Sequence, residues 1–555
     1  MAHLQPFTAE MGFEALCSLT GIRPTNEKDS IAAKEICHLL GGLPLAIVQI
    51  SEVIRDRGCS YEEFLQSYRS FAAEIHAGAE RPVEYNRALS TVSELSLHTL
   101  PENATLLQNL IVFFEADGIE ERLLRNPTAG LTDERFEFLQ DDFEFGEAVS
   151  ALIRSSLVNR SSAREALSVH RLVQAAVFAR LSKDQMILFL DSTITILSNG
   201  FPNTWRKAGH QQGHGWSSWA TCSKVLPHVN WLIDLVTKHK LKASYPELFA
   251  ELVFRSGTYL WERDQPSAAQ SFFTFGLSLD VDREGPICNP AVRLLGHIAL
   301  DMAQPRTALA AYNEALAARL KLVGPDDPII ADLYDSIACS YTEMDNTTKA
   351  FEYLDKASRI HHAKDPQKMG RTNAIFAMTF LRAGKPDQAL GALKDCWRLQ
   401  DLTEEEVALS NYPKHSGDIV LLSRIQAAQG HRESALELAS KSITIRQGIL
   451  GNKGPRVADS MYLVASMLRD DRKEASAAKM LREIVDMSQG MVDMEGHLAR
   501  ALWTLAGVEE EIGNRDEAEA LRSKAREARE KIKGRETEDE DTNEGFSKLV
   551  GYMLW

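Results

Sequence analysis

The sequence has no long hydrophobic run. No stretch approaches the roughly 18 consecutive apolar residues that a transmembrane helix needs, and the N-terminus lacks the basic and apolar regions of a signal peptide. Positive charge is also in short supply, because the net charge of the 555 residues is −16. A negative chain is poorly suited to bind nucleic acid or an anionic membrane. We therefore expect a cytoplasmic protein that binds neither.

Cysteine is sparse, and the number of cysteines is odd. Seven scattered cysteines are typical of reduced thiols in a cytosolic protein rather than of a disulfide framework. They are Cys17, Cys37, Cys59, Cys222, Cys288, Cys339 and Cys396.

Strings that mark catalytic or metal sites are missing as well. The sequence has no G-x-S-x-G, no H-E-x-x-H and no calcium-binding loop. His210, His214, Cys222 and His228 come nearest to a zinc site, but their spacings match no closed ligand pair of the usual structural sites. The acidic stretch 141–145 is interpreted as a solvated connector. We predict no catalytic residues, no metal site and no enzyme activity.

What the sequence does contain is an internal repeat in its second half. A phrase that begins at Arg319 returns from Arg446 with matching residues at matching spacing, an offset of 127 residues or about three units of 42. A fixed period of this size indicates stacked helix–turn–helix units. Such a stack presents an extended groove and seldom builds a catalytic pocket.

Each unit carries two small residues that are twelve positions apart. Small side chains are expected where two antiparallel helices touch, because a large one would push them apart. The first members of the pairs are Gly257, Gly296, Ala338, Ala377, Ser423, Ala465 and Ala506. The second members are Ala269, Ala308, Ala350, Ala389, Ala435, Ala477 and Ala518. The pattern predicts a mainly α-helical solenoid of about seven repeats.

The repeat pattern resembles the tetratricopeptide repeat (TPR) over about residues 246–533. The linking phrase 319–328 resembles the 42-residue variety found in kinesin light chains. The resemblance implies that a protein or peptide binds in the groove formed by the first helix of each unit. The mixed aromatic and aliphatic groove positions favour an apolar or amphipathic peptide over an acidic one. The candidate groove residues are Phe254, Trp261, Arg293, His297, Tyr341, Met378, Arg424, Tyr462 and Trp503.

The front half shows no such period but carries two separate motifs. Residues 42–46 read Gly-Leu-Pro-Leu-Ala, and Pro44 can begin a helix because its missing N–H would be unpaired there in any case. Residues 156–159 and 167–170 read as two short strands of a hairpin. The hairpin closes at His170, which Arg171 follows.

These motifs, in this order, resemble the GLPLA box, the winged-helix domain and the MHD motif of NB-ARC proteins. NB-ARC proteins are the nucleotide-switched (STAND) ATPases of plant and fungal immune-type receptors, also called NLR-like, and fungal members with repeat tails often show the His-Arg form. The resemblance covers about residues 1–185. It implies that Pro44 packs against a nucleotide base and that His170 reaches a phosphate. The alternatives are a proline that begins a helix and a histidine that closes a hairpin.

A P-loop, G-x-x-x-x-G-K-[ST], is absent from the chain. The nucleotide-binding core of the family would precede Met1. We therefore expect no cofactor, with ADP or ATP bound only if an upstream P-loop domain exists. The leading hypothesis is a protein-binding scaffold or sensor that resembles the C-terminal part of an NLR-like switch. The alternatives are an NTPase complemented by a missing nucleotide-binding domain, and a free-standing TPR adaptor.

The motifs divide the chain into five predicted parts. These are a helical ARC-like subdomain (1–80), a winged-helix-like domain (81–185), a helical connector (186–245), the solenoid (246–533) and an acidic linker with an apolar C-terminal segment (534–555).

The apolar C-terminal segment has three possible destinations. We expect it to fold back as a short helix over an exposed end of the solenoid. A peptide that docks on another protein is the alternative, and its last four residues, 552–555, are also a candidate occupant of the chain's own groove.

Overall fold

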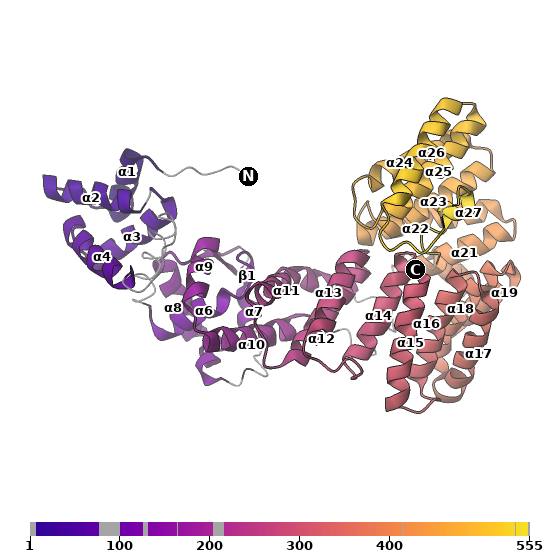
Figure 1. Ribbon diagram of the computed structural model, residues 1–555, viewed down its shortest axis with the longest axis horizontal. Helices are drawn as coiled ribbons and strands as arrows, with labels where there is room; N and C mark the ends of the chain where they lie inside the picture. The colour runs from indigo at the N-terminus through magenta and orange to yellow at the C-terminus, as the bar shows by residue number, and fades with distance from the viewer. Residues whose placement is uncertain are drawn as a thin grey trace. The chain divides into compact units, whose positions relative to one another are not determined.

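A computed structural model of the chain describes residues 7–40, 42–76, 100–125, 131, 133–163, 165–203, 216–412, 415–538 and 540–552. These residues are mainly α-helical, as predicted, and include one small sheet (Figure 1). The chain divides into two compact units, of which unit 1 holds residues 1–202 and 220–252, and unit 2 holds residues 203–219 and 253–555. None of the helices in the described ranges is long and apolar enough to cross a membrane.

Unit 1 begins with four helices packed around one apolar core. Pro44 occupies the first turn of the third of these helices. The turn before it is tight, because a β-carbon on Gly42 would lie 2.4 Å from the carbonyl oxygen of Phe7. The helices are α1 (Ala9–Thr20), α2 (Glu27–Leu39), α3 (Pro44–Arg57) and α4 (Tyr61–His76).

A small antiparallel sheet follows in unit 1, with strand order β1-β3-β2. The expected hairpin is present as β2 (Val158–Ser161) and β3 (Ala166–Val169), with Val158 opposite Val169. The short strand β1 (Ile119–Glu120) was not expected. The helices around the sheet are α6 (Glu102–Ile111), α7 (Glu121–Arg125), η1 (Glu134–Leu139), α8 (Asp142–Arg154) and α9 (Arg171–Arg180).

The interpretation of residues 141–145 as a connector is wrong. Asp141 is the N-cap of α8, and its carboxylate accepts hydrogen bonds from the amides of Phe143 (2.8 Å) and Glu144 (2.9 Å). Phe145 is buried one turn into this helix. The acidic residues therefore begin a helix, as the cap preference of aspartate allows.

The connector of unit 1 consists of α10 (Lys183–Gly200) and most of α11 (Trp219–His239). His228 is buried there, and its Nδ1 accepts a hydrogen bond from the Glu115 amide at 3.1 Å. Burial lowers the pKa of His228 to about 4. Of the other residues weighed as zinc ligands, Cys222 is buried, whereas His210 and His214 lie outside the described residues.

The repeats follow as seven helical pairs among the described residues, and successive helices of unit 2 pack side by side (Figure 1). The pairs are α12 (Pro246–Glu262) and α13 (Pro266–Ser278), α14 (Cys288–Asp301) and α15 (Pro305–Leu322), α16 (Pro328–Glu343) and α17 (Thr347–Lys364), α18 (Met369–Arg382) and α19 (Pro386–Arg398), α21 (Ser416–Ala428) and α22 (Arg432–Leu450), α23 (Pro455–Asp470) and α24 (Glu474–Ser488), and α25 (Glu495–Ile512) and α26 (Arg515–Glu530). Short helices lie at η4 (Pro366–Lys368), α20 (Glu404–Leu409) and α27 (Asn543–Ser547), and η3 (Trp216–Ser218) precedes α11.

The small residues of the repeat lie where the paired helices cross. All fourteen are buried. A β-carbon on Gly296 would come within 2.3 Å of the Tyr312 ring, and one on Gly257 within 2.9 Å of Phe273. The predicted spacing therefore marks the helix contacts that hold each repeat together.

The solenoid also closes on itself, because its first repeat contacts its sixth. The backbone N–H of Arg456, in the first turn of α23, donates to Asp264 at 2.8 Å. The guanidinium of the same residue lies 3.8 Å from Asp264 and 3.5 Å from Asp301. A second bridge joins the hydroxyl of Ser267 to Asp493. Unit 2 is thus a strongly curved stack in which distant repeats touch.

Candidate peptide-binding groove

The first helices of several repeats converge on a hollow of about 630 Å³ in unit 2. Its walls come from the C-terminal ends of α16 and α18 and from α21, α23 and α25, and residues 536–538 and 540–552 run along it. A second hollow of about 440 Å³ adjoins it and shares Arg382, Arg424, Asp459, Arg500 and Tyr552. We call the two hollows together the groove, and residues 536–552 the C-terminal segment.

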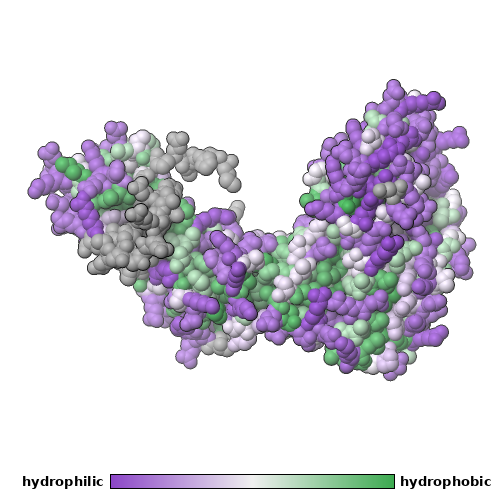
Figure 2. Space-filling view, in the orientation of Figure 1, coloured by the Kyte–Doolittle hydropathy of each residue, from purple (hydrophilic) through white to green (hydrophobic). Residues whose placement is uncertain are grey.

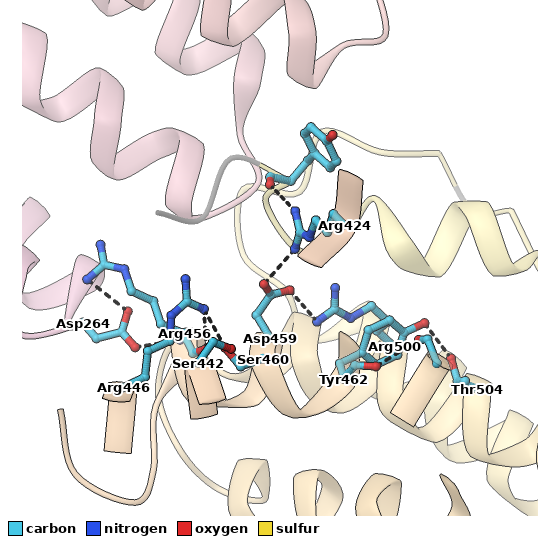
Figure 3. Close-up of polar contacts among 12 residues, drawn as sticks. Asp264, Arg424, Ser442, Arg446, Arg456, Asp459, Ser460, Tyr462, Arg500 and Thr504 are labelled. Carbon is cyan, nitrogen blue, oxygen red and sulfur yellow. Dashed lines mark hydrogen bonds and ion pairs between the residues drawn. The ribbon is translucent and has the colours of Figure 1, made fainter. Parts of the chain in front are cut away.

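Two arginines and one aspartate form the polar centre of the groove (Figure 3). Asp459 on α23 binds Arg424 of α21 at 2.9 Å and Arg500 of α25 at 3.3 Å. The carboxylate is 2 % exposed. Burial raises its pKa, but Arg424 and Arg500 more than offset that effect and hold the pKa below its usual value. This centre therefore stays ionised and carries an excess of positive charge.

Tyr552 of the C-terminal segment is bound at this centre by backbone and ring. Its amide donates to Glu343 at 2.6 Å, and its carbonyl oxygen accepts from Arg424 at 3.0 Å. The ring centroid lies 4.8 Å from the guanidinium of Arg382 and 5.3 Å from that of Arg424. Cations over an aromatic face are attracted by its quadrupole, more strongly where water is excluded. Burial raises the pKa of the Tyr552 hydroxyl, and the two arginines offset only part of that effect.

Phe546 occupies a second aromatic site in the same segment. Its ring stacks on Trp503 with a centroid distance of 4.4 Å and an angle of 9° between the planes. The guanidinium of Arg529 lies 4.8 Å from the ring centroid. Trp503 also donates to the side chain of Asn543 at 3.0 Å. The start of α27 is thereby held against α25 and α26.

The acidic part of the C-terminal segment is bound through its carboxylates, one at a helix N-terminus and one by two arginines. Glu536 accepts hydrogen bonds from the amides of Arg306 (2.6 Å) and Thr307 (2.8 Å) at the start of α15. A carboxylate is favourable at a helix N-terminus, where amides are unpaired. Asp541 binds Arg526 at 2.7 Å and Arg529. The C-terminal segment was expected to fold back as a short helix over one end of the solenoid. It does form the short helix α27 against the last repeat, but it also crosses the stack to the second repeat.

Some of the predicted groove residues lie at this site. The carbonyl oxygen of Met378 accepts from the Tyr552 hydroxyl at 3.5 Å, while Arg424 and Trp503 make the contacts described above. Tyr462 lines the second hollow, and the Arg500 guanidinium lies 3.8 Å from its ring centroid.

The other predicted groove residues lie in the packing between helices. Phe254 is fully buried and stacks on Phe273, and Trp261 donates to Asp301 at 2.7 Å. Arg293 donates to Ser336 at 3.1 Å, and His297 pairs with Tyr312 at 2.8 Å. Tyr341 stacks on Tyr353.

Four residues that line the groove are not among the predicted ones, although their helical spacing pointed to them. Arg382 stands four positions after the predicted groove residue Met378, and Glu343 stands four positions after Cys339, which holds the position equivalent to Met378 in the preceding repeat. Residues four apart share a helix face, so one more turn of the same face would have included them. Asp459 and Arg500 similarly stand three positions before Tyr462 and Trp503.

In unit 1, Pro44 and His170 both stand at helix starts. Pro44 opens α3, and His170 is the N-cap of α9, where its Nδ1 accepts from the Leu172 amide at 3.3 Å. The His170 side chain is exposed at this position. The nucleotide contacts implied for these two residues stay predictions.

One group of described residues has the composition of a metal site. Ligand atoms of Asp332, Asp335 and His361 lie within 4.8 Å of one another. Lys368 binds Asp332 at 3.0 Å, and Thr372 donates to Asp335 at 2.9 Å. Burial raises the pKa of Asp332, but the nearby cations lower it by more than that and leave it below its usual value. Protein cations already supply the charge that a metal ion would bring.

Comparisons with known proteins identify the repeats. Residues 287–363 match the tetratricopeptide repeat family, and residues 95–186 match a domain of unknown function, DUF7779. The second half therefore carries tetratricopeptide repeats. No curated protein matches the chain in sequence.

Several solved structures are similar to the chain at low identity. One is a STAND protein with a tetratricopeptide repeat sensor from Pyrococcus horikoshii, with 13 % identity, 94 % of this chain and 72 % of that chain covered, and a TM-score of 0.39. Another contains the nearly identical TPR-like repeats of a protein described as a kinesin light chain from Podospora anserina. It has 16 % identity, covers 37 % of this chain and 98 % of that chain, and has a TM-score of 0.27. A third is aspartyl phosphate phosphatase F from Bacillus subtilis, with 16 % identity, coverage of 67 % and 90 %, and a TM-score of 0.35.

Proposed function

We propose that this protein is a protein-binding scaffold whose groove takes a peptide segment of a partner. The observation that carries this proposal is the occupant of the groove, which is a segment of the chain itself. Glu343 and Arg424 bind the backbone amide and carbonyl of Tyr552, and such contacts are open to any peptide. The aromatic sites then supply selectivity, as side-chain pockets do in other forms of peptide recognition.

Binding in trans tests this function. A Tyr552→Ala substitution in the full chain removes the ring held by Arg382 and Arg424, and should free the groove. A fluorescent peptide of residues 540–552 should then bind, and fluorescence anisotropy should show at least a tenfold weaker affinity when Arg424→Ala is added. Arg432→Ala is the matched control, because Arg432 is 65 % exposed and pairs with Asp471 away from the groove. Failure of the peptide to bind the Tyr552→Ala chain would refute the proposal.

For the front half we propose the regulatory portion of an NLR-like switch, without catalytic activity of its own. The proposed lack of catalytic activity is supported by Pro44 and His170, which each serve as a helix start in the described structure. A nucleotide would gain only one stacking and one phosphate contact from them, short of the several amides and the lysine that dominate phosphate binding. We accordingly propose a cytoplasmic protein with no cofactor, no metal and no nucleic-acid or membrane partner.

Calorimetry with ADP and ATP tests this second part. We expect no binding at micromolar concentration. Binding that His170→Ala abolished would instead favour the NTPase that a nucleotide-binding domain complements. A chain whose front half could be replaced without effect on partner binding would favour the free-standing adaptor.

A further inference from the structure

The C-terminal segment holds two aromatic anchors six residues apart. Phe546 is 1 % exposed on Trp503, and Tyr552 lies between two guanidinium groups. Between them, Leu549 and Val550 are 6 % and 5 % exposed. The spacing of the two sites is set by α25 on one side and by α16, α18 and α21 on the other. A ligand must therefore match both sites at once.

The position before the second anchor accepts only a very small residue. A β-carbon on Gly551 would lie 2.6 Å from the carbonyl oxygen of Leu300, an atom of a buried helix backbone. Side-chain motion cannot relieve that contact, because the obstacle is main chain. The shape of the groove therefore selects glycine at position 551, and the two guanidinium groups select an aromatic ring at position 552.

An acidic residue five positions before the first anchor completes the pattern. Asp541 binds Arg526 and Arg529, and it is 42 % exposed. An exposed pair of this kind contributes little to stability. It contributes more to the rate and orientation of encounter, because charges steer association.

We infer that the partner of this groove is a peptide with an acidic residue, an aromatic residue five positions later and a Gly-Tyr pair that ends six positions after the aromatic. The chain's own C-terminal segment carries the same pattern and competes with the partner for the groove. This inference rests on the proposed function and names the ligand and the competitor for the same site.

The competition follows from tethering. A segment joined to its own site by a short linker is present there at an effective concentration in the millimolar range. The partner's apparent affinity is reduced by the fraction of chains whose groove is free. A groove occupied nine times in ten would thus bind the partner about tenfold more weakly than a free one. Any signal that loosens the segment would raise the affinity for the partner by the same factor.

The experiment compares three full-length proteins by anisotropy with the labelled peptide of residues 540–552. They are the wild type, the Phe546→Ala/Tyr552→Ala double variant and a Gly551→Val variant. Both variants weaken the tethered segment and leave every repeat unchanged, so either one suffices if the other fails to fold. We expect at least tenfold tighter peptide binding to the variants than to the wild type. Tyr245→Ala is the matched control, since Tyr245 is 64 % exposed and lies in none of the sites of the segment.

Peptide variants test the pattern on the same proteins. Phe546→Ala, Tyr552→Ala and Gly551→Val in the peptide should each weaken binding to the double variant at least tenfold. Ser547→Ala should not, because Ser547 is exposed in the segment.

Each outcome decides a different claim. Equal affinity of wild type and variants for the peptide would overturn the competition and leave the groove function standing. Tight binding that ignores all three peptide changes would overturn the pattern alone. No binding to any of the proteins would overturn the proposed function itself.

Discussion

At the scale of single residues, the size of one side chain decides whether two helices of a repeat can touch. Gly296 of α14 faces the Tyr312 ring of α15, and no room for a β-carbon exists between them. Helical glycine normally costs stability relative to alanine. Its presence here shows that close helix packing outweighs that cost.

We predict that Gly296→Ala destabilises the protein by about 1–3 kcal/mol, because the added methyl group overpacks a filled site. Gly391→Ala is the matched control, since a β-carbon at this position in α19 meets nothing within 4 Å. The control should stabilise the helix by about 0.5–1 kcal/mol. Thermal unfolding followed by circular dichroism measures both, and equal shifts for the two variants would contradict this account.

A second residue-scale prediction concerns pH. Burial raises the pKa of Asp301 to about 6 from 3.8, although Arg456 and Trp261 pull it down. A pKa that is higher in the folded state means that the protonated carboxyl favours folding. Its stabilising contribution is complete below about pH 3.8 and is lost as the pH rises through about 6.

Asp301→Asn cannot ionise and should not show this loss. The variant should therefore gain stability relative to the wild type as the pH rises from 4 to 7, by up to about 3 kcal/mol. Unfolding midpoints measured across that range test the sign. A difference between the two proteins that stayed constant with pH would exclude Asp301 as the titrating group.

At the scale of elements, α8 shows that a helix signal can be hidden by an acidic composition. The acidic composition of residues 141–145 favours a solvated connector. Yet apolar residues recur at helical spacing immediately after the cap, and all are buried. These residues are Phe145, Ala148, Val149 and Leu152.

We predict that Asp141→Ala lowers stability by about 1 kcal/mol, through loss of the two hydrogen bonds at the start of α8. Glu147→Ala, at an exposed position within the same helix, is the control and should change stability by less than about 0.5 kcal/mol. Chemical denaturation of the full chain compares them. An uncapped helix as stable as the control would mean that tertiary packing alone holds α8 in place.

At the scale of the whole molecule, unit 2 is more than a sum of neighbouring repeats. Arg456 links the sixth repeat to the first through Asp264 and to the second through Asp301. The C-terminal segment ties the seventh repeat to each of the repeats from the second to the fifth. A solenoid normally owes its stability to contacts between adjacent repeats alone. The additional contacts restrain the curvature of this stack. The surface around the last repeats is predominantly hydrophilic on the face shown (Figure 2).

We predict that Arg456→Ala costs about 3–5 kcal/mol, because it leaves two buried carboxylates without their cation. Arg456 is 5 % exposed, whereas Arg432, which pairs with Asp471, is 65 % exposed. Arg432→Ala should cost less than about 1 kcal/mol. Small-angle scattering should also show a more open particle for Arg456→Ala alone, and an unchanged radius of gyration would argue against the closure.

The sequence alone was enough to predict the helical class, the repeat register and the hairpin of unit 1. The reason is that these features arise from contacts between elements adjacent in the sequence. The small residues recur at a fixed spacing, such as the twelve residues from Gly296 to Ala308, and the two strands of the hairpin follow one another directly. Met378, Arg424 and Trp503 also follow from the repeat register and contact the C-terminal segment, whereas peptide binding by them stays a prediction.

Only the tertiary structure decided what fills that groove and how the stack closes. Tyr552 meets Glu343 across 209 positions of the chain, and Arg456 meets Asp264 across 192. Contacts at such separations depend on the small rotation between repeats, accumulated over four or five of them, and no local pattern records that sum.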